Sequence, residues 1–278
     1  MKISQNEFEL FRRLIQEKCG IYLDNSKAYL IENRLARLIT VTGCKNFGDL
    51  YFMVKNTSRS KKLINQVIEA VTTNETLWFR DQYPFKALND IIFPKYLKSS
   101  NFSNINIWSA GCSTGQEPYS IAITANEFSK LMPDRKNFYK RFSILGTDIS
   151  EAAIEHAQIG EYDEIAIQRG LTPIRLKNYF YKNGKKWQVS DAIKKMTHYQ
   201  NLNLLELPPR FGPFDIVFIR NVMIYFSEEL KRTIFQNITS VLNKGGYLFL
   251  GTGETVQGYS DKYDFLKHEG GIFFQLKS

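Results

Sequence analysis

One segment near the middle of the chain constrains its fold most: two apolar runs, joined by a turn of small residues and a helix-length segment. The first run covers residues 105–108, and the turn after it carries Gly111 and Gly115. The second run, 142–147, ends at Asp148. Doubly wound sheets hold adenosine in this way, because the glycines let the backbone approach the ligand and the carboxylate accepts hydrogen bonds from the ribose. The segment therefore predicts a Rossmann-like α/β sheet that binds an adenosine cofactor.

The residues after the turn indicate which adenosine cofactor fits. A glycine turn alone is weak evidence, because small residues also let a helix pack against a strand. In dinucleotide-binding chains, the G-x-G-x-x-G turn leads into a helix whose start carries no acidic side chain. Here, Glu117 follows Gly115 closely. That carboxylate would repel a pyrophosphate but suits a positively charged ligand. S-adenosylmethionine (SAM) carries a sulfonium and an ammonium group and no phosphate, so we predict SAM as the cofactor.

Later apolar runs predict a parallel sheet that closes with an antiparallel hairpin. Runs at 198–201, 215–219 and 247–250 alternate with helix-length segments, as in parallel sheets. Near the end of the chain, the runs 265–268 and 271–276 flank a Glu-Gly-Gly turn that is typical of a hairpin. A strand inserted antiparallel at this edge is characteristic of SAM-dependent methyltransferases of class I.

The first part of the chain predicts an all-helical domain. Apolar residues repeat at helical spacing in two segments before residue 40, and further helices are expected around 50–54 and over 62–71. On the second helix, Lys27, Arg34 and Arg37 lie away from the apolar stripe. We expect these three residues to form an outward-facing basic surface that docks a partner.

A second predicted feature interrupts the sheet at about 161–200. Asn183 and Gly184 form a typical hairpin turn between aromatic and β-branched residues, so we predict a small β subdomain there. The predicted organisation is a helical domain over 1–71, a cofactor-contacting linker over 72–90 and a methyltransferase domain over 91–278.

Charge and composition narrow the choice of partners. The net charge is +9, of which residues 1–62 supply +6 and residues 161–200 supply +4, so the rest of the chain is nearly neutral. The basic regions are either solvated surfaces or docking surfaces for an acidic partner. No signal-peptide pattern or membrane-spanning apolar run is present, so we expect a cytoplasmic protein without membrane insertion. We also expect a monomer. The three cysteines and three histidines share no ligand spacing, which predicts neither a metal site nor a disulfide.

Five segments, in order, resemble the chemotaxis receptor methyltransferases, the CheR family. They read TNETLWFR (73–80), WSAGCSTGQEPYS (108–120), GTDIS (146–150), FDIVFIRNVMIYF (214–226) and GGYLFLG (245–251). The resemblance implies that the protein methylates glutamate side chains on the cytoplasmic methylation helices of chemoreceptors, during chemotactic adaptation. The products would be glutamyl methyl esters and S-adenosylhomocysteine (SAH). A glutamate is already ionised at neutral pH, so this chemistry needs no general base.

The resemblance also implies which residues form the site. Arg80 and Tyr225 match the residues at the transferring methyl group and are the catalytic candidates. Asp148 matches the ribose-binding carboxylate, and Asn203 with Leu204 matches the pair beside the adenine. The full set of implied cofactor contacts is Asn74, Thr76, Arg80, Gly111, Glu117, Asp148, Asn203, Leu204, Arg220 and Asn221.

Two alternatives stay open. The basic regions also suit a methyltransferase that acts on nucleic acid, or on another acidic protein. However, enzymes that methylate base amino groups carry an Asp/Asn-Pro-Pro-aromatic run where residues 220–223 read RNVM, and no cysteine stands there for cytosine C5 methylation. A module that binds the cofactor without catalysis is favoured only if Arg80 or Tyr225 is missing, and both are present. We therefore expect an acidic protein substrate and no nucleic acid.

The chain departs from the family pattern at one hairpin. The turn at Asn183 and Gly184 is shorter than the glycine-rich loop by which some members hold a pentapeptide at a receptor's C-terminus. We therefore expect receptors without that pentapeptide to be methylated as well as receptors that bear it.

Overall fold

The N-terminal part of the protein is a bundle of four helices. The computed structural model describes residues 1–56, 60–98, 104–132 and 138–277. The four helices are α1 (Gln5–Cys19), α2 (Ala28–Thr42), α3 (Phe47–Asn56) and α4 (Ser60–Val71). Their apolar faces meet in a common core in which Phe8, Phe11 and Leu35 are fully buried. The predicted helices are present, and α3 and α4 begin before the predicted 50–54 and 62–71, while residues 57–59 between them lie outside the described residues.

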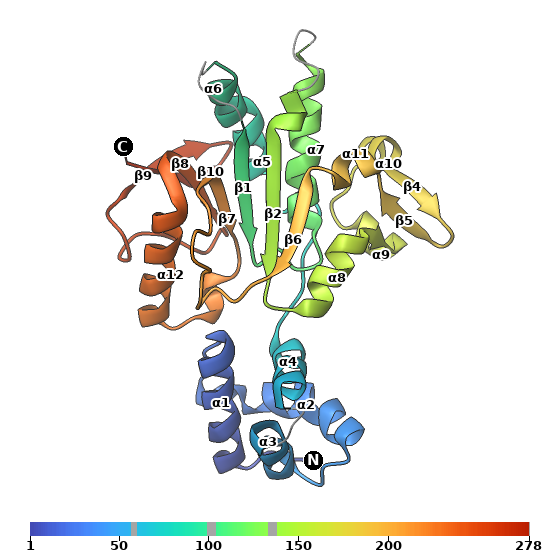
Figure 1. Ribbon diagram of the computed structural model, residues 1–278, viewed down its shortest axis with the longest axis vertical. Coiled ribbons are helices and arrows are strands. Elements are labelled where there is room, and N and C mark those ends of the chain that lie inside the picture. The colour runs from blue at the N-terminus through green and yellow to red at the C-terminus, as the bar shows by residue number, and fades with distance from the viewer. Residues whose placement is uncertain (57–59, 99–103, 133–137, 278) are drawn as a thin grey trace.

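A seven-stranded mixed sheet forms the body of the molecule (Figure 1). Its strands, in spatial order, are β6 (Thr197–Asn201), β2 (Phe142–Asp148), β1 (Ile105–Ala110), β7 (Phe214–Ile219), β8 (Leu242–Leu250), β10 (Gly271–Leu276) and β9 (Tyr263–His268). The first five strands are parallel, and β10 is antiparallel to both of its neighbours. This arrangement confirms the predicted methyltransferase sheet with its closing hairpin.

Helices cover both faces of the sheet, and alternate strand residues pack against them. On β7, Ile216 and Phe218 face the cluster that includes α5 (Tyr83–Ala87), η2 (Leu88–Ile92), α6 (Phe93–Lys98) and α7 (Gln116–Lys130). Val217 and Ile219 face the opposite way, toward α12 (Glu228–Val241). All four side chains are fully buried, as expected for a central parallel strand. No helix in the described ranges is long and apolar enough to cross a membrane.

A small three-stranded sheet projects from one side of the body (Figure 1). Its strands are β3 (Glu161–Tyr162), β5 (Lys186–Val189) and β4 (Phe180–Asn183), accompanied by α9 (Glu164–Gln168), α10 (Pro173–Tyr179) and α11 (Asp191–Lys194). Asn183 pairs with Lys186 across the turn, and Gly184 has a φ of 60°. The predicted hairpin is therefore present.

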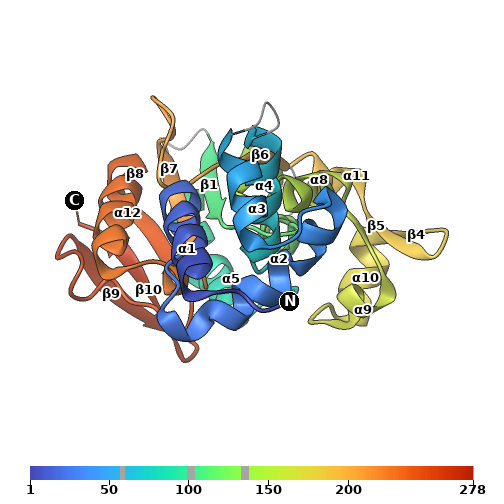
Figure 2. The ribbon, with the colours of Figure 1, turned by 90° about the horizontal axis from the view of Figure 1, so that it is seen from below.

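The helical bundle lies over the carboxyl ends of the central strands (Figure 2). On one side, the N–H of Tyr22 donates to the carbonyl of Tyr225 at 2.8 Å. On the other side, Glu69 of α4 accepts hydrogen bonds from Ser150 Oγ (2.6 Å) and from the N–H of Ala152 (3.2 Å), where α8 (Glu151–Ile159) begins. A carboxylate is stabilised at a helix N-terminus. The two contacts hold the bundle above the point where the strand order reverses, which is where sheets of this type bind ligands.

Candidate active site

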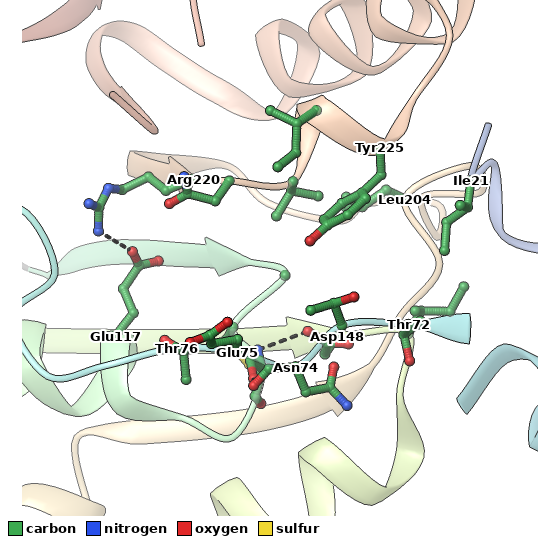
Figure 3. A pocket seen from close by; sticks show the side chains of 18 of the residues that line it. Ile21, Thr72, Asn74, Glu75, Thr76, Glu117, Asp148, Leu204, Arg220 and Tyr225 are labelled. Atoms are coloured by element: carbon green, nitrogen blue, oxygen red, sulfur yellow. Dashed lines mark hydrogen bonds and ion pairs between the residues drawn. The ribbon is translucent and has the colours of Figure 1, made fainter. Parts of the chain in front are cut away.

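A cavity of about 340 Å³ lies between the helical bundle and the carboxyl ends of the central strands. Every residue that the sequence analysis assigned to the cofactor or to the methyl group lines this cavity. Figure 3 shows Asn74, Thr76, Glu117 and Asp148 on one side and Tyr225 on the other, with the tyrosine hydroxyl pointing into the space between them. The structure thus brings the predicted residues together, while their individual roles stay predictions.

Asp148 is held at the end of β2 by two backbone N–H groups. Its Oδ2 accepts from Ser113 at 2.8 Å, and its Oδ1 accepts from Ser150 at 3.0 Å. Burial raises the pKa of Asp148 above its ordinary value, although both hydrogen bonds oppose this. Each carboxylate oxygen keeps a further lone pair. The side chain can therefore accept the ribose hydroxyls of an adenosine.

We predict that Asp148→Ala weakens SAH binding at least about tenfold, because a hydrogen bond to a charged group contributes about 1.5–3 kcal/mol. Wild-type affinity should fall as the pH is lowered from neutral toward the raised pKa of Asp148, since protonation removes the charge. Asp148→Asn cannot titrate and should lose this pH dependence.

Calorimetry with SAH at several pH values measures both effects. Asp264→Ala, which removes an exposed carboxylate on β9, is the control and should bind as the wild type does. Unchanged affinity in Asp148→Ala would remove the ribose assignment.

A buried ion-pair network borders the cavity at Arg220. One guanidinium nitrogen donates to Glu117 Oε2 at 2.8 Å, and the other donates to Asp81 Oδ2 at 2.6 Å and to the carbonyl of Arg80 at 2.9 Å. The Arg220 side chain is only 2% exposed. Burial alone would lower the pKa of Arg220, but Glu117 and Asp81 raise it above its ordinary value, so the guanidinium stays charged. Arg220 therefore fixes Glu117 and the backbone at Arg80.

Arg80 lies in a strained segment and lines the cavity. Its neighbours Phe79, Asp81 and Gln82 have φ values of 49°, 64° and 50°. Non-glycine residues rarely adopt this left-handed conformation, and they persist where the surroundings hold them. Arg220 supplies that restraint through its bonds to Arg80 and Asp81. The Arg80 guanidinium has no ion pair or hydrogen bond with another described residue, so it is available to a carboxylate.

Asn203, which is predicted to lie beside the adenine, lines the cavity. Its Nδ2 donates to the carbonyl of Lys18 at the end of α1 (2.8 Å), and its Oδ1 accepts from the N–H of Leu205 (3.1 Å). Both ends of the amide are therefore used within the protein. Opposite, Gly111 has a φ of 72°, and a Cβ atom there would lie 2.4 Å from Val222. Only glycine permits this close approach of the two loops.

Arg34 does not have the outward-facing position that the sequence predicts. Its guanidinium donates to the carbonyls of Val71 and Thr72 at the end of α4, the latter at 2.9 Å. A cation at these free carbonyls stabilises the helix C-terminus. The expectation that Arg34 faces outward with the basic surface is wrong, because its side chain holds the linker. Lys27 precedes α2 rather than lying within it, and Arg37 is exposed.

Several residues that shape the cavity were not predicted from the sequence. Ser150 caps α8 by accepting from the N–H of Ala153, and its position before Glu151 is an ordinary N-cap signal that could have identified it. Asp81 gave no such signal, because its contact with Arg220 spans 139 residues. Glu254 accepts hydrogen bonds from two loops behind the cavity and was likewise not predicted.

Comparison with known families agrees with this geometry. The model for the all-alpha domain of CheR methyltransferases matches residues 6–72, and the model for their SAM binding domain matches residues 74–272. The chain belongs to the CheR methyltransferase family.

Relatives of similar length support the assignment. Chemotaxis protein methyltransferase 1 of Pseudomonas aeruginosa is 41% identical over 278 residues, which cover 100% of both chains. Chemotaxis protein methyltransferase Cher2 of Pseudomonas putida is 40% identical, again over 100% of both chains. The chemotaxis protein methyltransferase of Borreliella burgdorferi is 36% identical over 93% of this chain and 91% of its own.

Membership in this family makes the protein a SAM-dependent methyltransferase. The cavity fits SAM, because it is lined by the carboxylates of Asp148 and Glu117, which are the predicted partners of the ribose and of the positive charge. Its volume of about 340 Å³ lies in the range of small-molecule sites.

Proposed function

We propose that the protein transfers the methyl group of SAM to glutamate side chains on chemoreceptor methylation helices. One observation carries the proposal: the guanidinium of Arg80, which has no partner among the described residues, and the hydroxyl of Tyr225 share a cavity whose described lining contains no histidine or lysine. Such a site suits a nucleophile that is already ionised, and glutamate is ionised at neutral pH. The names of the relatives reported above, chemotaxis protein methyltransferases, support a chemoreceptor as the substrate. Because the methylation helices of chemoreceptors are cytoplasmic, we also propose that the enzyme acts in the cytoplasm.

Positioning of the glutamate is the main task of the site residues. SAM, held by Asp148 and Glu117, would supply an electrophilic sulfonium methyl group for the glutamate oxygen, with SAH as the leaving group. Arg80 can fix the glutamate through paired N–H donors, and the Tyr225 hydroxyl can donate to the same carboxylate. The helical bundle covers the cavity and restricts water. Alignment of this kind contributes roughly 7–11 kcal/mol to catalysis.

A nucleic-acid substrate has less support. Methylation of cytosine C5 needs a thiolate nucleophile, and burial raises the pKa of the Cys112 thiol in this cavity well above its ordinary value. The basic surface is also smaller than expected, because Arg34 is bound to the linker.

Identification of the methylated residue tests the proposed substrate. Receptor cytoplasmic fragments are incubated with the enzyme and SAM, and the methylated peptides are sequenced by mass spectrometry. We expect the methyl group on glutamates of acidic helices, and fragments with those glutamates changed to alanine should stay unmodified. Methylation on lysine or arginine, or in nucleic acid alone, would contradict the proposal.

We further propose that Lys27 and Arg37 dock the acidic methylation helix. Reversing both charges (Lys27→Glu with Arg37→Glu) should raise KM for the receptor while SAH affinity stays unchanged, since neither residue lines the cavity. The effect should shrink as salt rises, because exposed charges are screened. Steady-state kinetics at two salt concentrations measures this, on receptors with and without the C-terminal pentapeptide.

The matched control for docking reverses the charges of two exposed lysines at strand β9, which is not part of the helical bundle: Lys262→Glu with Lys267→Glu. We expect this control to leave the receptor KM unchanged. Methylation that survives the Lys27 and Arg37 reversal, or that is lost when the pentapeptide is deleted, would show that another face docks the receptor.

A further inference from the structure

The carboxylate of Glu254 accepts hydrogen bonds from the backbone of two loops, at the carboxyl ends of β7 and β8. Its Oε1 accepts from the N–H groups of Val222 (3.0 Å) and Ile224 (3.3 Å). Its Oε2 accepts from the N–H groups of Asn221 (2.8 Å) and Gly251 (2.7 Å). An ionised carboxylate offers about four lone-pair sites, so these four bonds use its capacity. Glu254 does not itself line the cavity, and its bonds lie behind the wall that Asn221 and Ile224 form.

The backbone conformation at Asn221 and Gly251 allows both loops to reach the Glu254 carboxylate. Asn221 has a φ of 59°, which turns the chain directly after β7. A Cβ atom on Gly251 would lie 2.7 Å from Glu254 Oε2 and 2.8 Å from the nitrogen of Asn221. The two loops can approach only because residue 251 is a glycine.

The loop that Glu254 holds also presents Tyr225. The N–H of Tyr225 donates to the carbonyl of Val222 at 3.2 Å, which closes the short turn η5 (Met223–Tyr225). Glu254 binds the N–H groups of Val222 and Ile224, so the turn is anchored at its start and at its middle. These anchors hold the turn that carries Tyr225, whose ring points into the cavity (Figure 3), and the Tyr22 N–H holds the Tyr225 carbonyl from the other side.

We propose that Glu254 is a positioning residue for methyl transfer, which holds the loop so that the Tyr225 hydroxyl reaches the reacting groups. This inference rests on the proposed function for the role of Tyr225. Hydrogen bonds to a charged acceptor are stronger than those to a neutral one. The negative charge therefore matters as well as the shape of the side chain.

Glu254→Gln tests the proposal in the full-length protein, because it keeps the size but loses the charge and one acceptor oxygen. We expect kcat on receptor fragments to fall about tenfold to a hundredfold, since misplacement by about 1 Å can cost a hundredfold. SAH affinity should fall less than kcat does, because Asp148 at the end of β2 and Asn203 after β6 are untouched, and Asn221 is the one implied cofactor contact that Glu254 holds. Glu254→Asp keeps the charge with a shorter reach and should show a smaller loss of kcat. Glu229→Gln, on the exposed surface of α12, is the matched control and should behave as the wild type.

Amide hydrogen exchange gives a readout that does not need the substrate. In the SAH-bound protein, the amides of Asn221, Val222 and Ile224 should exchange at least about tenfold faster in Glu254→Gln than in the wild type. Wild-type exchange and wild-type kcat in this variant would overturn the proposal. So would a loss of kcat matched by equal losses of SAH affinity and melting temperature, because that pattern describes a structural role only.

Failure of the positioning role is distinguishable from failure of the proposed function. If the wild-type protein leaves receptor fragments unmethylated, the proposed function fails, and the exchange experiment alone decides whether Glu254 holds the loop. If Glu254→Gln does not fold, the same comparisons with Glu254→Asp decide the question.

Discussion

Arg80→Ala is expected to lower kcat/KM for receptor methylation by at least about thirtyfold. Removing one partner of a hydrogen-bonded charge pair costs about 2–5 kcal/mol, and each 1.4 kcal/mol corresponds to about a tenfold change. Tyr225→Phe removes a single hydroxyl and should lower kcat about tenfold. Both side chains line the cavity rather than the core, so the fold should be unaffected.

Steady-state kinetics and a melting curve together check this prediction. Arg141→Ala is the control, because Arg141 is exposed and directly precedes β2, at the opposite end of the strand from Asp148. If Arg80→Ala methylates the receptor at the wild-type rate and with wild-type affinities, Arg80 has no catalytic role. The same outcome for Tyr225→Phe would withdraw the role of Tyr225.

Arg220→Leu should cause the largest loss of stability. The guanidinium pairs with Glu117 and Asp81 while only 2% of its side chain is exposed. Removing one member of a buried ion pair leaves unpaired charge and costs about 3–5 kcal/mol. Each kcal/mol lowers the melting temperature of a protein of this size by about 2–4 °C, so we expect a fall of roughly 6–20 °C.

Arg169→Leu provides the comparison for this stability change. Arg169 pairs with Glu75 at 2.7 Å, but the two side chains are 43% and 69% exposed. Exposed pairs contribute about 0–1 kcal/mol, so the melting temperature should fall by no more than about 4 °C. Calorimetric melting curves measure both variants. Equal shifts in the two would show that the buried network does not stabilise the protein as described.

Strand positions were predictable where burial sets the pattern. Val217 and its neighbours on β7 are buried on both faces, and such a continuous apolar run is visible in the sequence. The start of β8 was not predictable. This strand begins at Leu242 rather than at 247, because Leu242 pairs with Phe214 across a register shift, and the intervening residues are polar or glycine.

Site residues were predictable where the signal is local. Gly111 and Asp148 stand at spacings that a nucleotide-binding turn requires, and both line the cavity. Glu254 and Arg34 make contacts 33 and 37 residues away in the chain. A single charged residue outside any periodic pattern is expected to be a solvated side chain, so neither role could be predicted from the sequence. Only the fold places these charges against backbone groups that need a partner.

Release of methanol from labelled product tests the central claim most directly. The protein is incubated with SAM carrying a radioactive methyl group and with receptor cytoplasmic fragments or, in parallel, with DNA and RNA. A glutamyl methyl ester is cleaved by mild alkali, whereas methyl groups on amines and on nucleic-acid bases are stable. We predict label in the receptor fragments that alkali releases as volatile methanol, and no label in nucleic acid. Alkali-stable label, or label in nucleic acid alone, would contradict the assignment as a glutamate O-methyltransferase.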